Sequence, residues 1–526
     1  MHWTPSHCHA ALAALVLAGA LPGAAVAVEP GQVLNTTSGQ AYVSLAAALA
    51  DSRDGDRIEL GSGDYAGAFE IEAPVSLVGI DTGGGLPVID GKGSTIVLDV
   101  KAAGISIEGI AITSTGSPAR PWGFLTPYGE EACILVEADN VRIVNNTITG
   151  CGQGIYVRNT TGAVLSHNTV ENNHVGGIFL LNSQSATVSA NTIVDNGYLG
   201  VTVQTFSFPR GIEMSYRAAK LVGDWWEVTY ETRDLTEIIS EDIIISDNLV
   251  RGHGQGGVLV GFARRISTLA NTITENGGAP PSAIDTAFYG AAATPSARGF
   301  GVLLNCDAYD NVVADNLVRD NDNHGIDAAF SVMNRIEGNA VEGSDWGIML
   351  QGSFGNRVEQ NVVTGNAQYG IRIETGLLVD GMLSLPSIGN WVLGNDLANP
   401  GINAFDSSSG DAREPSKVWF DVADIKKLPA FPSDRTNHWD DGVRGNHYSD
   451  FDEPSEGFAD KDGDGVGELA HAIPGGDAVD RYPLATGVAA APVGEAAATS
   501  AVASTSCRLL ILCPAAATDG AACLPS

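Results

Sequence analysis

Positive charge is scarce in this 526-residue chain, which carries 28 Lys and Arg residues against 62 Asp and Glu residues. The formal net charge is −34 at pH 7. Nucleic acids and anionic lipids are bound largely through Lys and Arg, so the sequence predicts no nucleic-acid partner. A polyuronate ligand stays open, because bound Ca²⁺ can invert the local field. The same acidity also suits a solubilising surface in a salty or extracellular medium.

Long apolar runs are absent beyond residue 27, where no segment approaches the roughly 18 apolar residues that a membrane span requires. Residues 1–27 contain no Lys, Arg, Asp or Glu, and their apolar stretch precedes the small-x-small sequence Ala25-Val26-Ala27. This pattern is typical of a secretory signal peptide, although histidines replace the usual basic start. We therefore expect an exported protein, secreted or periplasmic, without a membrane span, and we expect a monomer.

The repeated part of the chain has no helix-length apolar pattern and consists instead of short β-type runs. Eight glycines each open an apolar run, and successive glycines lie 23, 23, 57, 44, 24, 22 and 23 residues apart. A recurring Asn keeps the same period. Leucine-rich repeats share this period, but their Leu framework is absent. The glycines are Gly154, Gly177, Gly200, Gly257, Gly301, Gly325, Gly347 and Gly370, and the asparagines are Asn146, Asn168, Asn191, Asn248, Asn271, Asn316, Asn339 and Asn361.

A unit of about 22 residues with two or three strands cannot bury its apolar side alone, but stacked units share a continuous core. The sequence therefore predicts an all-β fold, a right-handed parallel β-helix whose coils lie about 4.8 Å apart. In this arrangement each repeated Asn stacks on the Asn of the next coil and hydrogen-bonds along the stack.

The chain divides into five parts. The segment Ser44–Asp51 reads as one short helix, which we expect to cap the open end of the β-helix. The predicted parts are a signal peptide at 1–27, the cap and irregular coils at 28–130, regular coils at 131–400, a C-terminal coil with an acidic motif at 401–484, and an Ala-rich tail at 485–526.

Six cysteines follow the predicted signal peptide. Cys133 and Cys151 lie about one coil apart, so a disulfide between stacked coils is geometrically possible, and export favours it. Sequence alone does not establish pairing. Cys306 is predicted to be buried and free, whereas three further cysteines fall in the C-terminal tail.

Four insertions interrupt the coils at about residues 114–131, 205–240, 276–299 and 375–389. By their position in the repeat, two lead into the strand that follows the repeated Gly and two leave it. Long loops that flank one face of a rigid scaffold commonly build a binding groove. The longest insertion contains Trp225 and Trp226, which we expect to contact a ligand.

Period-2 alternation on that strand sets which side chains face outward. Three adjacent coils place His324, Trp346 and Tyr369 in one outward column. Flat aromatic faces beside carboxylate, guanidinium and amide groups suit sugar rings. His or Tyr could transfer a proton beside a uronate carboxyl group while Arg stabilises the developing charge. The catalytic candidates are His324, Asp327, Tyr369 and Arg372, and the substrate-binding candidates are Trp346, Gln351, Glu374, Asn305, Trp225 and Trp226.

An acidic loop near the C-terminus alternates Asp460, Asp462 and Asp464, with Glu468 following. The spacing is that of the first half of an EF-hand loop, and hard oxygen ligands favour Ca²⁺. We therefore predict a structural Ca²⁺ site. The alternative is an Asp-Gly turn held by its own side-chain-to-backbone hydrogen bonds.

Two end motifs carry a family resemblance. The block Ile473–Leu484 resembles the closing motif of NosD-like parallel β-helix proteins, and Gly55–Leu60 with Val88–Gly91 resembles their start. The resemblance spans about residues 40–484 and implies a β-helix domain of the carbohydrate-binding and sugar-hydrolase type. The family's namesake assists copper-site maturation of nitrous oxide reductase in the periplasm. This chain has only five Met residues and no Met or His cluster after residue 27, so soft copper ligation lacks support.

Three functions remain open. The first is an exported protein that binds a polysaccharide or cell-envelope glycan in a groove and processes it as a lyase or epimerase. The second is a non-enzymatic NosD-type accessory protein for copper-enzyme maturation. The third is a structural envelope protein. The aromatic and ionisable side chains near residues 324–374 favour the first.

Overall fold

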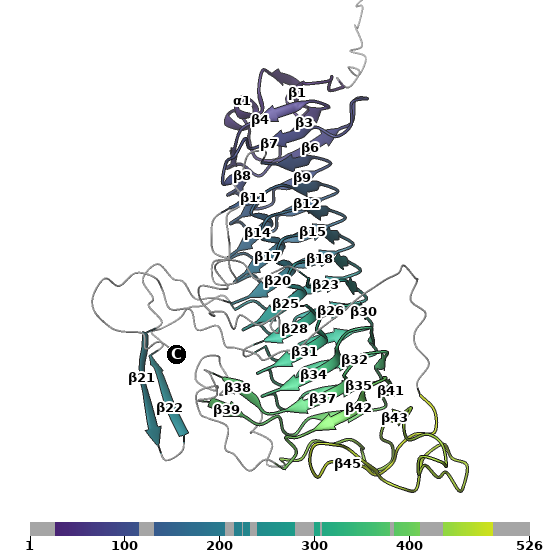
Figure 1. Cartoon of the computed structure of the whole chain (residues 1–526). Coiled ribbons are helices and arrows are strands. Elements are labelled where there is room, and N and C mark those ends of the chain that lie inside the picture. The colour runs from purple at the N-terminus through teal and green to yellow at the C-terminus, as the bar shows by residue number, and fades with distance from the viewer. Residues whose placement is uncertain are drawn as a thin grey trace, which may run out of the picture.

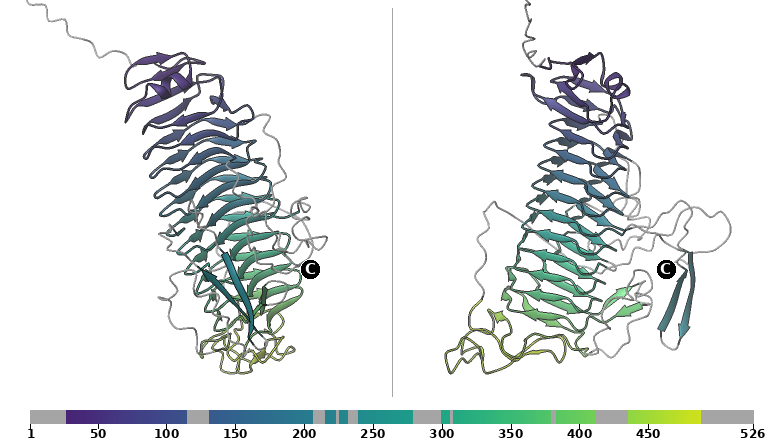
Figure 2. Two further views of the ribbon diagram at one scale, coloured as in Figure 1. Left: turned by 90° about the vertical axis from the view of Figure 1, so that its left-hand side faces the viewer. Right: turned by 180° about the vertical axis from the view of Figure 1, so that it is seen from behind.

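The computed structural model describes residues 27–114, 131–205, 215–222, 225–231, 239–278, 299–305, 308–378, 383–410 and 435–487. Residues 1–26 of the predicted signal peptide, Cys306 and the cysteines of the tail lie outside these residues. The strands of the three large sheets stack into one long column (Figure 1). Three sheets run along this column, and the views in Figure 2 show the successive coils one above another.

The 12-stranded sheet contains the strands that follow the repeated glycines. All its neighbouring strands are parallel, as the repeat predicts. Its strands are β5 (Phe69–Ile71), β8 (Ile96–Val100), β11 (Ala132–Val136), β14 (Gln153–Arg158), β17 (Gly176–Leu181), β20 (Leu199–Gln204), β25 (Gly256–Gly261), β28 (Phe300–Asn305), β31 (His324–Ala329), β34 (Trp346–Gln351), β37 (Tyr369–Glu374) and β42 (Ile402–Asp406).

Two further sheets complete each coil. The 14-stranded sheet consists of β2 (Gln40–Tyr42), β1 (Val33–Asn35), β3 (Arg57–Gly61), β6 (Ser76–Ile80), β9 (Ser106–Glu108), β12 (Arg142–Val144), β15 (Val164–Ser166), β18 (Thr187–Ser189), β23 (Ile244–Ser246), β26 (Ser267–Leu269), β29 (Val312–Ala314), β32 (Arg335–Glu337), β35 (Arg357–Glu359) and β40 (Trp391–Leu393). The 13-stranded sheet consists of β4 (Asp64–Ala66), β7 (Val88–Asp90), β10 (Ala111–Thr113), β13 (Thr147–Thr149), β16 (Thr169–Glu171), β19 (Thr192–Val194), β24 (Leu249–Arg251), β27 (Thr272–Thr274), β30 (Leu317–Arg319), β33 (Ala340–Glu342), β36 (Val362–Thr364), β41 (Asp396–Ala398) and β43 (His447–Tyr448).

Three antiparallel hairpins form small sheets of their own. They are β21 (Ser215–Val222) with β22 (Trp225–Glu231), β38 (Gly376–Leu378) with β39 (Leu383–Leu385), and β44 (His471–Ala472) with β45 (Val479–Asp480). The first two begin soon after β20 and β37, so they belong to insertions that leave the 12-stranded sheet.

The core lies inside the column, where identical positions of successive coils stack. Ile326 pairs in register with Ile348, which pairs with Ile371, and all three are completely buried. Every second residue of these strands points into the core, so the intervening residues lie on the outer face, as predicted from the period.

A ladder of asparagines follows one corner of the coils. Each side-chain Nδ2 donates to the Oδ1 of the next coil's Asn at 2.8–3.1 Å. The ladder confirms the prediction from the repeat and continues it by two members. Its members are Asn146, Asn168, Asn191, Asn248, Asn271, Asn316, Asn339, Asn361, Asn395 and Asn446.

A second ladder of side chains that hydrogen-bond from coil to coil includes the imidazole of His253. His253 Nδ1 accepts from the backbone N–H of Asn196 at 3.2 Å, and His253 Nε2 lies 3.1 Å from the carbonyl oxygen of Ile193. Burial lowers the pKa of His253 to about 4, so the ring is neutral at pH 7 and takes the place of an Asn side chain.

A short helix, α1 (Leu45–Ala50), lies near the N-terminal end of the column. The hydroxyl of Ser44 accepts from the backbone N–H of Ala47 at 3.2 Å, which caps the helix N-terminus. Leu45 and Ala48 join the core. The capping role of α1 for the whole β-helix stays a prediction. No helix in the described part of the chain is long and apolar enough to cross a membrane.

Cys133 and Cys151 form a disulfide, with their Cα atoms 5.4 Å apart. The bond joins β11 to the residues just before β14, which are neighbouring coils. Their spacing of about one coil allowed this pairing to be considered from the sequence, and the structure confirms it.

Candidate functional site

Three neighbouring strands, β31, β34 and β37, bring most of the predicted site residues together on the outer face of the 12-stranded sheet. His324 pairs in register with Trp346, and Trp346 with Tyr369, so the predicted aromatic column is present. Beside it run two further columns. These are Asp327, Met349 and Arg372, and then Ala329, Gln351 and Glu374. We call His324, Asp327, Trp346, Gln351, Tyr369, Arg372 and Glu374 the polar site.

The rings of the polar site form a continuous series. His324 and Trp346 have ring centroids 4.8 Å apart, and Trp346 meets Tyr369 edge-on at 5.9 Å. Tyr369 in turn lies 5.5 Å from Phe405 on β42, the next strand. Sequence reasoning missed Phe405, because Asn403 rather than a glycine occupies the position of Gly370 on β42, so the glycine rhythm does not mark this coil.

Asp327 is the hydrogen-bonding centre of the polar site. Its Oδ2 lies 3.2 Å from His324 Nδ1 and accepts from Gln351 Nε2 at 3.0 Å. An ionised carboxylate only accepts, so His324 Nδ1 carries a proton in this contact. The other ring nitrogen, Nε2, has no hydrogen-bond partner among the described residues.

Arg372 is enclosed by aromatic rings. Its Cζ lies 4.4 Å from the centroid of Trp346, 4.6 Å from that of Tyr369 and 5.4 Å from that of Phe405. Such cation–π contacts are stronger where water is excluded. One terminal nitrogen of Arg372 also donates to Glu374 on the same strand.

Glu374 sits in an environment that opposes its charge. Burial raises the pKa of the Glu374 carboxyl above its ordinary value, and Arg372 opposes that shift. The nearby Asp327 carboxylate raises the pKa further, while His324 lowers it. Electrostatically, Glu374 and Asp327 therefore belong to one group of charges.

The inner part of the polar site is buried, which outward alternation alone does not predict. The exposed fractions are 4% for His324, 4% for Asp327, 5% for Trp346 and 5% for Gln351. Tyr369 and the Arg372–Glu374 pair are only partly covered and form its accessible edge.

Among the described residues, four polar atoms of this cluster are buried without a hydrogen-bond partner: His324 Nε2, Asp327 Oδ1, Trp346 Nε1 and Arg372 Nε. Most buried polar atoms in folded proteins are satisfied, and leaving one unpaired costs about 1–3 kcal/mol. These unpaired atoms therefore lower the stability of the folded chain. They are complementary to a ligand that has its own hydrogen-bond donors and acceptors.

Three predicted binding residues lie elsewhere. Asn305 ends β28 and pairs with Ala329, so one strand separates it from Gln351. Trp225 and Trp226 open β22, and the structure places them in a separate hairpin rather than in the 12-stranded sheet. Their contact with a ligand stays a prediction.

The same sheet carries an apolar patch several coils earlier. It consists of outward residues that pack on one another, with the rings of Tyr156 and Phe179 stacked at 5.0 Å. We call Ala132, Leu135, Tyr156, Phe179 and Leu181 the apolar patch.

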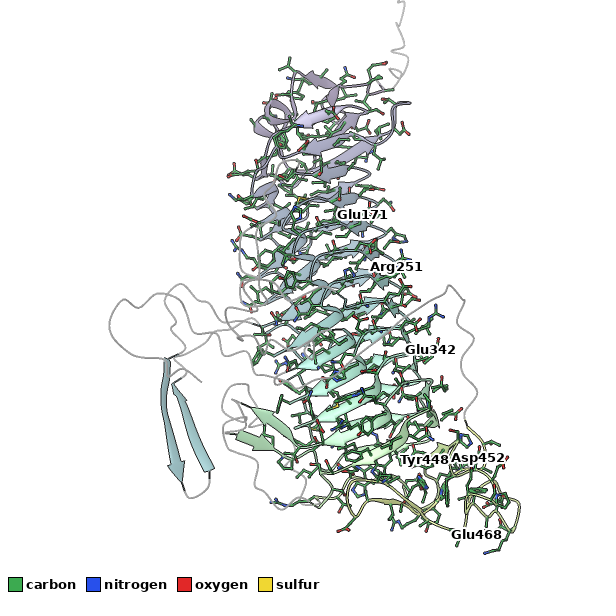
Figure 3. The ribbon with its side chains drawn as sticks, viewed as in Figure 1. Glu171, Arg251, Glu342, Tyr448, Asp452 and Glu468 are labelled. Carbon is green, nitrogen blue, oxygen red and sulfur yellow. A yellow bond between two sulfur atoms is a disulfide. The ribbon has the colours of Figure 1, made fainter. Side chains whose placement is uncertain are left out.

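The acidic loop lies in the C-terminal segment, where Figure 3 labels Glu468 at the lower end of the molecule. Carboxylate oxygens of Asp460, Asp462 and Asp464 lie within 4.8 Å of one another. Asp460 also accepts from the backbone N–H groups of Gly463 and Gly465, at 2.7 and 3.0 Å. Glu468 accepts from the backbone N–H of Lys461 at 2.8 Å and does not belong to this set of three neighbouring carboxylates. These contacts are compatible with both predicted readings, so the Ca²⁺ site stays a prediction.

Comparisons with known proteins agree with this architecture. The family model of the right handed beta helix region matches residues 85–217. The model of the periplasmic copper-binding protein (NosD) matches residues 294–453, which include the polar site. No curated protein sequence matches the chain.

Several solved structures are similar. The A-module of mannuronan C-5 epimerase AlgE6 from Azotobacter vinelandii is 14% identical, with 69% of this chain and 91% of that chain covered and a TM-score of 0.46. The periplasmic alginate epimerase AlgG is 14% identical over 66% of this chain and 81% of that chain, with a TM-score of 0.38. The catalytic domain of a GH87 α-1,3-glucanase is 10% identical over 71% and 66%, with a TM-score of 0.44. Identities this low say nothing about activity. The chain is a right-handed parallel β-helix protein of the pectin-lyase-like fold, whose later coils match the NosD family.

Proposed function

We propose that the protein binds a polysaccharide at the polar site on the outer face of the 12-stranded sheet. The observation that carries the proposal is the group of four buried, unpartnered polar atoms on His324, Asp327, Trp346 and Arg372. A ligand that forms hydrogen bonds with these atoms removes the free-energy cost of leaving them unpaired.

The side chains of the site suit a sugar ring. Tyr369 is partly exposed beside the buried Trp346, so part of an aromatic ring can contact the C–H groups of a sugar. Deeper in the site, Asp327 Oδ1 is an unpartnered acceptor and Trp346 Nε1 is an unpartnered donor among the described residues. This combination of aromatic surface and few convergent polar atoms is typical of small-molecule and sugar sites.

The predicted signal peptide indicates that this binding takes place outside the cytoplasm. An exported protein meets the polysaccharides of the cell envelope or the medium, and the matching family model describes a periplasmic protein. Lyase or epimerase chemistry stays a prediction of the sequence. It needs a proton acceptor such as His324 or Tyr369 and a cation to stabilise the charge that develops on a uronate carboxyl group.

The test is retention on a polysaccharide affinity gel. We expect the double variant Trp346→Ala/Tyr369→Ala to lose retention, because it removes two adjacent rings of the site. Trp391→Ala is the matched control, since Trp391 stacks on His438 on a different sheet. Circular dichroism checks that each variant is folded, and absorbance of unsaturated ends reports lyase chemistry. Unchanged retention by the folded double variant would contradict the proposal.

The NosD match favours one second candidate, a non-enzymatic accessory protein for copper-enzyme maturation. Copper sites use His, Cys and Met ligands. Among the described residues, the one group of three His, Cys, Asp or Glu side chains that could hold a metal is Asp460, Asp462 and Asp464, outside the matched range. Within the matched range, the described residues therefore form no group of three His, Cys, Asp or Glu side chains that could hold copper. Stoichiometric copper retained after gel filtration, without glycan binding, would establish this candidate instead.

A further inference from the structure

We infer that the polar site takes uncharged sugar residues and that Glu374 is the residue that sets this preference. The inference rests on the proposed glycan binding and narrows it to a ligand class. Two independent features carry it: the balance of unpartnered donors and acceptors, and the pairing of the only arginine of the site.

The unpartnered atoms include both donors and an acceptor. Trp346 Nε1 and Arg372 Nε are donors, whereas Asp327 Oδ1 is an acceptor. His324 Nε2 accepts or donates according to the protonation of the ring. A sugar hydroxyl both donates and accepts, so hydroxyl groups can satisfy all four atoms. A carboxylate only accepts, and would leave the lone pairs of Asp327 opposed to its own.

The charges point to the same class of ligand. Arg372 already donates to Glu374, so part of the fork with which it would grip a uronate carboxylate is occupied. Arg372 pairs with Glu374, and the Asp327 carboxylate, two strands away on the same face, raises the pKa of Glu374, so two carboxylates share the site with one guanidinium. A third carboxylate in this buried site is repelled by the first two, and charge repulsion is strong where water is excluded.

An uncharged ligand limits the chemistry that is possible at the polar site. A lyase or epimerase removes a proton from the carbon next to a uronate carboxyl group, and an uncharged sugar has no such group. We therefore expect binding at this site without the elimination or epimerisation that the sequence suggested.

The experiment compares polymers that differ only in the carboxyl group. Polygalacturonate and alginate are each tested against their carboxyl-reduced forms, in which CH₂OH replaces COO⁻ on the same backbone. Affinity electrophoresis of the full chain is run in EDTA, so that no cation bridges carboxylates to the acidic surface. We expect at least one reduced polymer to be retained about tenfold more strongly than its uronate parent, a difference of about 1.4 kcal/mol.

Glu374→Gln tests the named residue. It keeps the shape of the side chain and removes its charge, so we expect retention of the uronate polymers to increase and the tenfold ratio to fall below about threefold. The chain offers a matched control, because Arg335-Ile336-Glu337 repeats the Arg372-Ile373-Glu374 sequence and its ion pair on the 14-stranded sheet. Glu337→Gln should leave the ratio unchanged.

The outcomes separate the two proposals. Uronate polymers retained as strongly as their reduced forms would overturn the preference while leaving glycan binding in place. An unchanged ratio in folded Glu374→Gln would remove Glu374 as its determinant. If the wild-type chain retains none of the polymers, the proposed function itself fails.

Discussion

The apolar patch and the polar site occupy the same outer face of one sheet, yet they use it in opposite ways. Leu135, Tyr156 and Phe179 stand in the middle column of that face, and Asp327 and Arg372 stand in the same column several coils later. Burial is similar, with 1% of Phe179 and 4% of Asp327 exposed. The backbone scaffold is therefore constant, and only the side chains change.

This difference separates two uses of burial. In the apolar patch, buried rings and aliphatic groups contribute directly to stability through the hydrophobic effect. In the polar site, equally buried groups leave hydrogen-bonding atoms unpaired, which lowers the stability of the unliganded chain. Sites that sacrifice stability in this way are expected to be functional.

The largest expected effect is on stability at the apolar patch. Phe179→Ala removes a ring stacked on Tyr156 in a fully buried position and should cost about 3–5 kcal/mol of unfolding free energy. Urea unfolding followed by circular dichroism measures the loss. The folded protein at low urea should retain polysaccharide as the wild type does. Weakened retention by folded Phe179→Ala would show that the two regions form one binding surface.

The positions of both regions could be predicted from the sequence, because the coil period fixes register. Once Gly325, Gly347 and Gly370 are aligned, His324, Trp346 and Tyr369 must lie in one column, and they do. The asparagine ladder follows for the same reason. In a solenoid, neighbouring residues are one period apart, so the sequence itself reports long-range contacts.

Side-chain partners could not be predicted in the same way. The period places Arg372 and Glu374 on the same outer face, but whether they pair depends on rotamers and on the rings around Arg372. It also does not show that Asp327 is enclosed. Trp225 and Trp226 lie in an insertion, where the repeat gives no register, and they form part of a separate hairpin.

The next largest expected effect is on stability at Asp327. It should distinguish a buried carboxylate that has an unpartnered oxygen from one whose two oxygens accept hydrogen bonds. Asp327→Asn is isosteric and removes a buried charge with an unpartnered oxygen, so we expect the unfolding free energy to rise by about 1 kcal/mol. Glycan affinity should fall about tenfold, because an acceptor for the ligand is lost. Thermal melts and affinity electrophoresis measure the two changes.

Asp406→Asn is the matched control for this prediction. Asp406 is fully buried, but its carboxylate accepts from Asn437, Trp439 and the backbone of Ser408. Replacement by Asn should therefore destabilise the protein. If Asp327→Asn also destabilised it and left glycan affinity intact, Asp327 would be a structural residue and the contrast between the two regions would be lost.

The smallest expected effect concerns the acidic loop, which lies apart from both regions in the C-terminal segment. If Asp460, Asp462 and Asp464 bind Ca²⁺ with the weak affinity of extracellular modules, millimolar Ca²⁺ should stabilise the protein by about 1 kcal/mol. Melting curves in Ca²⁺ and in EDTA measure this, and identical curves would favour the self-bonded Asp-Gly turn. Retention of uncharged glycans should be the same in both buffers, because no ligand of the polar site comes from this loop. If that retention depended on Ca²⁺, binding at the polar site would be coupled to the acidic loop. The difference between the apolar patch and the polar site would then not be enough to explain binding.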